Sequence, residues 1–254
     1  MNIDFHCTKC AKCCHDLRLP LTVPEAVAWL SRGDTVEVLC EIVPWPDGQD
    51  LDHPEVAAKL QRTFAAISGT LPVRIGVVLA ARHVGACPNL LSNGECGIYA
   101  ERPSVCRIYP AEANPFVMLH KPAKACPDEA WDASGPPLLR NGNVIDATLR
   151  RDIVVRRHSD VADVRAKERL CAVLGFAFGA VWNEGFVSHK VEGASLLAAL
   201  ASAVRDDAVA ETAGIAWTFL SERAESVDAL NAVGAHAIPS QARPDLPVAY
   251  LSFK

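Results

Sequence analysis

The sequence predicts an α+β protein that is mostly α: a small cysteine-rich domain with few short strands, followed by an alanine-rich helical domain. Two observations lead to this prediction. Nine of the ten cysteines lie between residues 7 and 126. Beyond turn-forming residues at 134–137 and 141–143, alanine becomes frequent, and helical periodicity covers residues 144–158, 161–182, 193–205 and 207–232. We therefore expect domains at 1–135 and 144–236, and an extended C-terminal tail at 237–254.

Composition and charge exclude several classes of protein. With 254 residues, half of them apolar, the chain can bury a substantial core. The net charge is −5 and the basic residues are mostly scattered, which argues against a nucleic-acid partner. The longest apolar stretch, residues 170–187, is interrupted by polar residues and glycines, so no membrane span is expected. The N-terminus lacks the features of a secretory signal, and we expect a cytoplasmic protein with reduced thiols.

Local signals predict four elements in the first half of the chain. A helix is expected to begin at Thr22, where Pro24 fits the first turn and Glu25 completes a capping box, and to end near Gly33. Alternating apolar and β-branched residues predict a strand over 36–44. Residues 53–67 are predicted to be helical, and residues 73–79 to form a second strand.

Four cysteines occur within eight residues near the N-terminus, in the pattern C-x2-C-x2-C-C. Two consecutive C-x-x-C spacings allow thiolates to converge on one centre, which suits zinc or iron–sulfur better than a packed core. Buried or disulfide-bonded cysteines are the alternative. Adjacent side chains tend to point in different directions, so the last two cysteines are expected to serve different centres. The residues are Cys7, Cys10, Cys13 and Cys14.

A second group of cysteines follows about eighty residues later, at Cys87, Cys96, Cys106 and Cys126. Gly94 fits a turn that presents Cys96, and prolines restrict the backbone around Cys106. Together the two groups supply eight thiols, enough for two four-coordinate metal centres. This grouping predicts that residues 1–135 form a cysteine-cluster metal-binding domain to which the N-terminal run must dock.

The remaining two cysteines are expected in the core. Cys40 has apolar neighbours within the predicted strand, and Cys171 lies in the helical half. Free cysteine is among the most frequently buried residue types, so neither is predicted to bind metal.

The cysteine pattern resembles that of the YkgJ-type cysteine-cluster proteins, which are described as zinc- or iron-chelating domains. Their hallmarks are C-x2-C-x2-C-C and a later C-P-x-L…C-x-I-Y…R-P-x-x-C-R-x-[YF]-P block, and both stand here in order over roughly residues 5–128. Flagellin lysine N-methylases carry a similar region, so the resemblance includes an enzymatic context. Family members usually have a glycine inside the first run, where this chain has Ala11 and Lys12.

Spacing favours iron–sulfur over zinc without deciding between them. Cys7, Cys10 and Cys13 reproduce the first three ligands of the bacterial ferredoxin run, and either Cys87-Pro88 or Cys126-Pro127 could supply the fourth. Structural zinc modules usually present two short pairs, whereas the second cysteine group is spread out. We expect at least one iron–sulfur cluster, with 4Fe-4S favoured, and a second cluster or a zinc site on the remaining thiols.

Side chains near the cysteines have weaker claims to a role. Any histidine of the region could replace a thiol, although eight cysteines make this unnecessary. Two arginines could donate to ligated sulfur or form ordinary ion pairs, and two tyrosines are expected to be core aromatics that shield the site. These residues are His6, His15, His83, His120, Arg102, Arg107, Tyr99 and Tyr109.

Three functions remain open from the sequence. The first is a metal-binding protein with a role in redox chemistry, sensing or metal handling. The second is a protein-modifying enzyme of the lysine N-methylase kind, which would have a protein substrate. The third is a zinc-stapled interaction module. No glycine-rich dinucleotide fingerprint follows a strand, which argues against a conventional methyltransferase, and the presence of catalysis stays open. The expected partners are metal ions and either a protein substrate or a redox partner.

Overall fold

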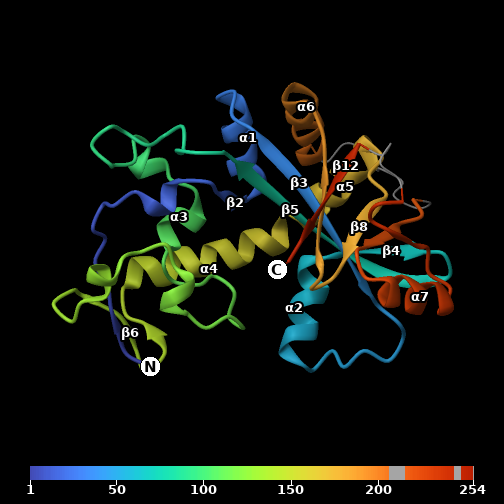
Figure 1. Cartoon of the computed structure of the whole chain (residues 1–254), viewed down its shortest axis with the longest axis horizontal. Coiled ribbons are helices and arrows are strands. Elements are labelled where there is room, and N and C mark those ends of the chain that lie inside the picture. Colours follow the sequence, from blue (N-terminus) through green and yellow to red (C-terminus); the bar gives the residue numbers. More distant parts are fainter. Residues whose placement is uncertain (206–214, 243–246, 254) are drawn as a thin grey trace.

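A nine-stranded mixed sheet forms the centre of the computed structural model, which describes residues 1–205, 215–242 and 247–253 (Figure 1). Its two long strands, β3 (Val36–Pro44) and β5 (Leu71–Arg82), pair antiparallel from Val36↔Ala81 to Pro44↔Val73. The far edge of β5 is shared by two shorter antiparallel strands. They are β2 (Arg18–Leu21) and β4 (Phe64–Ser68).

The other edge of β3 is shared by two strands from the second half of the chain. β8 (Phe178–Val181) runs parallel to β3 and continues the sheet through β10 (Thr218–Ser221) to β11 (Ala237–Pro239), all parallel. β9 (Gly185–His189) runs antiparallel to β3 and pairs with β12 (Val248–Ser252). Strands from both sides of the predicted break at 135–144, and from the predicted C-terminal tail, therefore share one sheet.

The expectation of a mostly α fold, with few short strands and a wholly helical second half, is wrong: the fold is mixed α/β. Residues 178–181 and 218–221, predicted to be helical, are strands. The helix predicted over 53–67 ends at Arg62, and its last residues, 64–67, belong to strand β4 instead. A strand buried between parallel neighbours shows no polar–apolar alternation, so a short apolar run cannot be told from a helix by periodicity. Part of the predicted helix over 207–232, residues 206–214, lies outside the described chain.

The elements with specific local chemistry are confirmed. Helix α1 (Val23–Ser31) begins at the predicted cap, where Glu25 N donates to Thr22 Oγ1 at 3.3 Å and Thr22 N donates to Glu25 Oε2 at 2.9 Å. It ends before Gly33, whose φ of 86° reverses the chain. The strand predicted over 36–44 has those bounds, and residues 73–79 lie inside β5.

Helices α1, α5 (Val164–Leu174) and α6 (Gly193–Val204) pack together over the face of β3 that carries Val38, Cys40 and Ile42. Cys40 and Cys171 are both fully buried in this core, as predicted. Helix α7 (Ala224–Ala232) packs beside β10 and β11. None of the helices in the described residues is long and apolar enough to cross a membrane.

The cysteine segments lie at one end of the molecule, to the left in Figure 1. A small antiparallel sheet there joins β1 (Ile3–Asp4), β6 (Pro137–Arg140) and β7 (Asn143–Val144). Helix α3 (Ser104–Ile108) packs on helix α4 (Ala147–Ala162), which runs from this end toward the large sheet, where it meets α2 (Pro54–Arg62) (Figure 1).

Strand β8 packs so closely against β3 that position 179 has no room for a side chain larger than that of glycine. A Cβ atom on Gly179 would lie 2.6 Å from Ile42 Cγ1, far inside van der Waals contact. Gly179→Ala is expected to lower the free energy of unfolding by about 1–3 kcal/mol because a buried strand must shift. The matched control is Gly193→Ala, whose new Cβ would meet nothing closer than Leu30 Cδ2 at 3.8 Å. Equal urea midpoints for the two variants would contradict this packing.

Candidate metal centre

The N-terminal cysteine run docks against the second cysteine group through backbone contacts. Cys87 N donates to Cys14 O at 2.7 Å. One step further along, Asp16 N donates to Gly85 O at 2.9 Å and Gly85 N donates to Asp16 Oδ1 at 2.6 Å. These bonds align residues 14–16 with residues 85–87, so the two segments meet as the sequence predicted.

The start of the same run docks against a different segment. Phe5 N donates to Pro136 O at 3.1 Å and His6 N donates to Ala130 O at 2.9 Å. The rings of Phe5 and Trp131 lie 4.9 Å apart between centroids. Because Cys126 precedes this segment by only a few residues, the contacts bring Cys7 into its vicinity.

The first set of neighbouring thiols is formed by Cys7, Cys10, Cys13 and Cys126. Cys13 interacts electrostatically with Cys126 and Cys7, and Cys126 interacts with Cys10 and Cys7. Burial, reinforced by its thiol neighbours, raises the pKa of Cys13 to about 12. Burial also raises the pKa of Cys126.

Tyr109 borders this set. Its hydroxyl oxygen lies 3.6 Å from Cys126 Sγ and accepts a hydrogen bond from Ala125 N at 2.8 Å. Burial and the hydrogen bond with Cys126 raise the pKa of Tyr109. A phenol in this position can hydrogen-bond the sulfur of Cys126 and shield it from water.

The second set is formed by Cys14, Cys87, Cys96 and Cys106. Cys14 interacts electrostatically with the other three, and Cys106 interacts with Cys87 and Cys96 and also with Cys13 of the first set. Burial, followed by the nearby Cys87 thiol, raises the pKa of Cys106 to about 12, while the Arg102 guanidinium acts in the opposite direction. Burial likewise raises the pKa of Cys14 and Cys87.

The two sets meet at the adjacent pair Cys13 and Cys14, whose thiols hydrogen-bond each other. Each of the ten cysteines is a free thiol, and the eight in these sets are all at least partly open to solvent. Among the described residues, no three histidine, cysteine or carboxylate side chains form a ready-made metal site. The donors nevertheless fit zinc or iron, because both metals accept four thiolates.

The turn that presents the run is built on left-handed backbone. Lys9 has a φ of 55° and Ala11 a φ of 58°, a region in which a side chain is strained. Ala11 and Lys12 occupy the run in which the resembling family usually has a glycine. Gly94 approaches this turn closely, since a Cβ there would lie 2.9 Å from Lys9 O, and Lys9 Nζ pairs with Glu95 Oε1 at 2.5 Å.

The two arginines differ in their surroundings. Arg102 lies near the second set, where its charge counteracts the rise in the pKa of Cys106. Arg107 instead contacts Asp152 of α4, with 3.6 Å between Nε and Oδ2, and so forms an ion pair. The expectation of a core aromatic is wrong for Tyr99, which is 67% exposed and lies under the Arg102 guanidinium.

The four histidines near the cysteines lie in different surroundings. His15 Nδ1 lies 3.0 Å from Ala11 O, which fixes its ring on the turn. His6 Nδ1 and both ring nitrogens of His83 are buried without a hydrogen-bond partner in the described residues. His120 precedes a short 3-10 turn over Lys121–Ala123 and has an exposed side chain.

Glu25 helps to position the second set of cysteines, whereas the sequence predicted only its role in the capping box of α1. Glu25 caps α1, and its Oε1 also accepts from Ser104 N, 2.6 Å away, at the start of α3. Arg156 of α4 donates to Ser104 Oγ at 3.1 Å. Cys106 on α3 is therefore tied to α1 and α4; the capping-box spacing identified Glu25 but gave no signal of its second partner.

Comparisons with known proteins add one finding. A family model described as "CxxCxxCC: Putative zinc- or iron-chelating domain" matches residues 6–127. No curated protein and no solved structure matches the chain.

The left-handed conformation of Ala11 generates a prediction. Ala11→Gly is expected to stabilise the protein by about 1 kcal/mol, because glycine adopts a positive φ without steric cost. Lys12→Gly is the neighbouring control; Lys12 has an ordinary φ in a 3-10 turn, so glycine there is expected to destabilise. Thermal unfolding at equal metal content checks both, and a lower melting temperature for Ala11→Gly would contradict the turn geometry.

Proposed function

We propose, from the match of residues 6–127 to the model of the CxxCxxCC zinc- or iron-chelating domain, that eight cysteines bind metal at two four-thiolate centres. The first centre consists of Cys7, Cys10, Cys13 and Cys126. The second centre consists of Cys14, Cys87, Cys96 and Cys106.

The division is supported by one observation: the adjacent residues Cys13 and Cys14 have different cysteine thiols as neighbours. Cys13 has Cys7 and Cys126 among its thiol neighbours, whereas Cys14 has Cys87, Cys96 and Cys106. Each set contains four soft donors, the number that zinc and iron–sulfur clusters both require. The contact between Cys13 and Cys14 makes the centres close neighbours.

The first centre is proposed to hold an iron–sulfur cluster, with 4Fe-4S favoured. Its three N-terminal cysteines have the ferredoxin spacing, and its fourth, Cys126, is followed by a proline. When bound, such a cluster supplies one-electron redox chemistry. Tyr109 can donate a hydrogen bond toward Cys126, a contact that raises the potential of a thiolate-bound cluster. Arg102 provides positive charge near Cys106 of the second centre and would act in the same direction there.

The second centre is proposed to hold another cluster or a zinc ion. Four thiolates leave a zinc ion no open position, so zinc there would have a structural role. A redox, sensing or metal-handling role follows for the protein if the first centre is reducible. A reducing compartment such as the cytoplasm would keep these thiols available for metal.

Metal analysis of anaerobically purified protein tests the nature of the centres. We expect brown protein with equal amounts of iron and inorganic sulfide, and a visible absorption band that bleaches with dithionite. Colourless protein containing zinc alone would remove the iron–sulfur assignment and leave the thiolate centres in place. Protein without metal after reconstitution with both iron–sulfide and zinc would contradict the whole proposal.

Single substitutions test the division into two centres. Cys10→Ser and Cys106→Ser are each expected to lose the metal of one centre and keep that of the other, as measured by metal analysis of the monodisperse fraction. Both variants should also unfold at lower temperature, because metal bound to thiolates contributes directly to folding.

The control for these variants is Cys171→Ser, which removes a buried thiol of the α5 core. It should leave metal content unchanged. Loss of metal in this control, or full metal content in both Cys10→Ser and Cys106→Ser, would show that the ligand set is wrong.

A further inference from the structure

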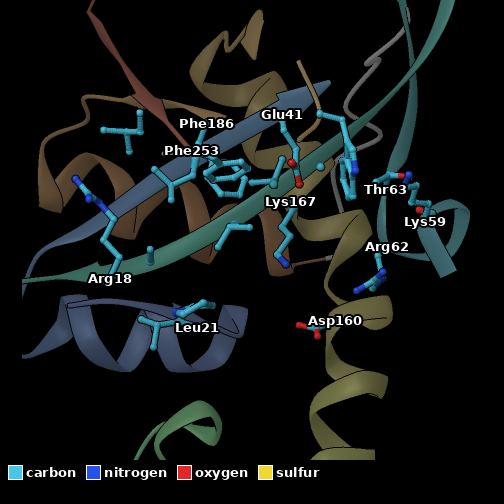
Figure 2. A pocket seen from close by; sticks show the side chains of 18 of the residues that line it. Arg18, Leu21, Glu41, Lys59, Arg62, Thr63, Asp160, Lys167, Phe186 and Phe253 are labelled. Carbon is cyan, nitrogen blue, oxygen red and sulfur yellow. The ribbon is translucent and has the colours of Figure 1, made fainter. Parts of the chain in front are cut away.

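A cavity of about 450 Å³ lies on the face of the large sheet opposite the helical core (Figure 2). Side chains alternate along β3, so Cys40 and Ile42 point into the core while Leu39 and Glu41 line the cavity. Helices α2, α4 and α5 provide further walls through Lys59, Asp160 and Lys167. None of the proposed metal ligands lines this space.

Two buried charged side chains project into the cavity without a hydrogen bond or ion pair in the described residues (Figure 2). Glu41 is 9% exposed and Lys167 is 8% exposed. Throughout the described ranges, no side chain or backbone group forms a hydrogen bond or ion pair with the Glu41 carboxyl or the Lys167 ammonium. Arg156, equally buried, shows the contrast: its guanidinium binds Asp160 and Pro20 O.

Burying a charged group that forms no hydrogen bond is unfavourable. Burial raises the pKa of Glu41 to about 8 and lowers the pKa of Lys167, although Asp163 and Asp160 act on the Lys167 ammonium in the opposite direction. The Glu41 carboxyl and the Lys167 ammonium do not stabilise the fold in this position unless another group forms hydrogen bonds with them. A bound molecule with polar groups would supply hydrogen bonds to both side chains.

The charge around the cavity favours an anionic group on that molecule. Arg18 and Arg156 are already paired, with Glu37 and with Asp160. Lys59 and Arg62 of α2 face Glu41 and lower the pKa of its carboxyl, in opposition to burial. Together with Lys167 they outnumber the Glu41 and Asp163 carboxyl groups that interact with them, so positive charge is in excess.

The rest of the wall is apolar and favours an organic body. Phe186 of β9 and Phe253 after β12 form an edge-to-face pair 5.2 Å apart, and Leu21 and Leu39 lie across the same space. The volume falls within the range of pockets that bury small ligands. An inorganic anion alone would leave this surface unfilled.

We propose that this cavity binds a small organic acid, a carboxylate or phosphate ester with an apolar body. Lys167 holds the acidic group together with Lys59 and Arg62 at the rim. Glu41 hydrogen-bonds a polar group of the ligand, and Phe186 and Phe253 contact its apolar part. This binding site is independent of the proposed metal centres.

A second cavity of about 510 Å³ adjoins the first and shares Arg62, Arg156 and Asp160 with it. Its wall continues to Tyr109, the residue that contacts Cys126. The organic acid would therefore lie on a surface continuous with the first centre.

Fluorescence titration with 8-anilinonaphthalene-1-sulfonate, an aromatic acid, tests the site in the full metal-loaded chain. We expect one saturable site per chain. Lys167→Met should weaken binding about tenfold or more, since it removes a charged hydrogen bond to the ligand. Glu41→Leu should also weaken binding, while Glu41→Gln, which keeps a hydrogen-bonding group, should largely retain it.

The control is Lys190→Met, which removes an exposed lysine outside both cavities. Without ligand, Lys167→Met should melt no lower than the unmodified protein and keep its metal content, because it removes a buried ammonium that forms no hydrogen bond or ion pair in the described residues. A structural role for Lys167 would lower the melting temperature instead. Equal binding by Lys167→Met and the unmodified protein, or the absence of a saturable site, would overturn the proposal.

Competition defines the ligand. Octanoate and phenyl phosphate represent the two kinds of acid, and displacement by either supports the proposal and identifies the preferred headgroup. Inorganic phosphate, which lacks an apolar body, and 1-octanol, which lacks an acidic group, should not displace the probe at the same concentration. Displacement by neither acid, or equally by inorganic phosphate, would overturn the assigned ligand class.

Discussion

The carboxylate of Glu25 is the contact on which the arrangement of the two ends of the molecule depends. It closes the first turn of α1, accepts from Ser104 N at the start of α3, and lies 3.9 Å from the guanidinium of Arg156 on α4. Helix α1 packs into the core of the large sheet, and α3 carries Cys106. Arg156 also binds Pro20 O of β2. One carboxylate thus connects the cysteine-bearing end to the sheet, and its loss would leave a buried arginine with fewer partners.

Much of the fold could be predicted where the cause is local. Thr22 and Glu25 form a capping box that predicts the start of a helix from four consecutive residues. The apolar and β-branched side chains of β3 are enough to predict that strand. The second half could not be read in this way. Its strand over residues 178–181 has the sequence Phe-Gly-Ala-Val because Ile42, far away in the chain, fills the space beside Gly179. Because the small residue Gly179 is required by Ile42, which is distant in the sequence, the residues next to Gly179 do not indicate a strand.

The candidate site also has a part that local sequence predicts and a part that depends on contacts between distant residues. Eight cysteines stand out by their spacing, yet their grouping depends on the docking of three distant segments. Contacts of Phe5 and His6 with residues 130–136 favour Cys126 over Cys87 as the neighbour of Cys7, and no spacing rule supplies that choice. Glu41 was not singled out because one polar residue in an apolar strand is unremarkable until its surroundings are known. Tyr99 was misjudged because aromatic residues usually lie inside, whereas this one is held outside by Arg102.

The shared edge of β3 also constrains the order in which the protein can be made. On the ribosome, β3 pairs early with β5, but its other edge stays bare until β8 and β9 have been synthesised about 140 residues later. At usual rates of translation this interval is on the order of ten seconds. An exposed strand edge invites pairing with other chains. During that interval the N-terminal thiols and a bare β-edge are exposed on the same nascent chain, so chaperone protection and thiol reduction would be needed together.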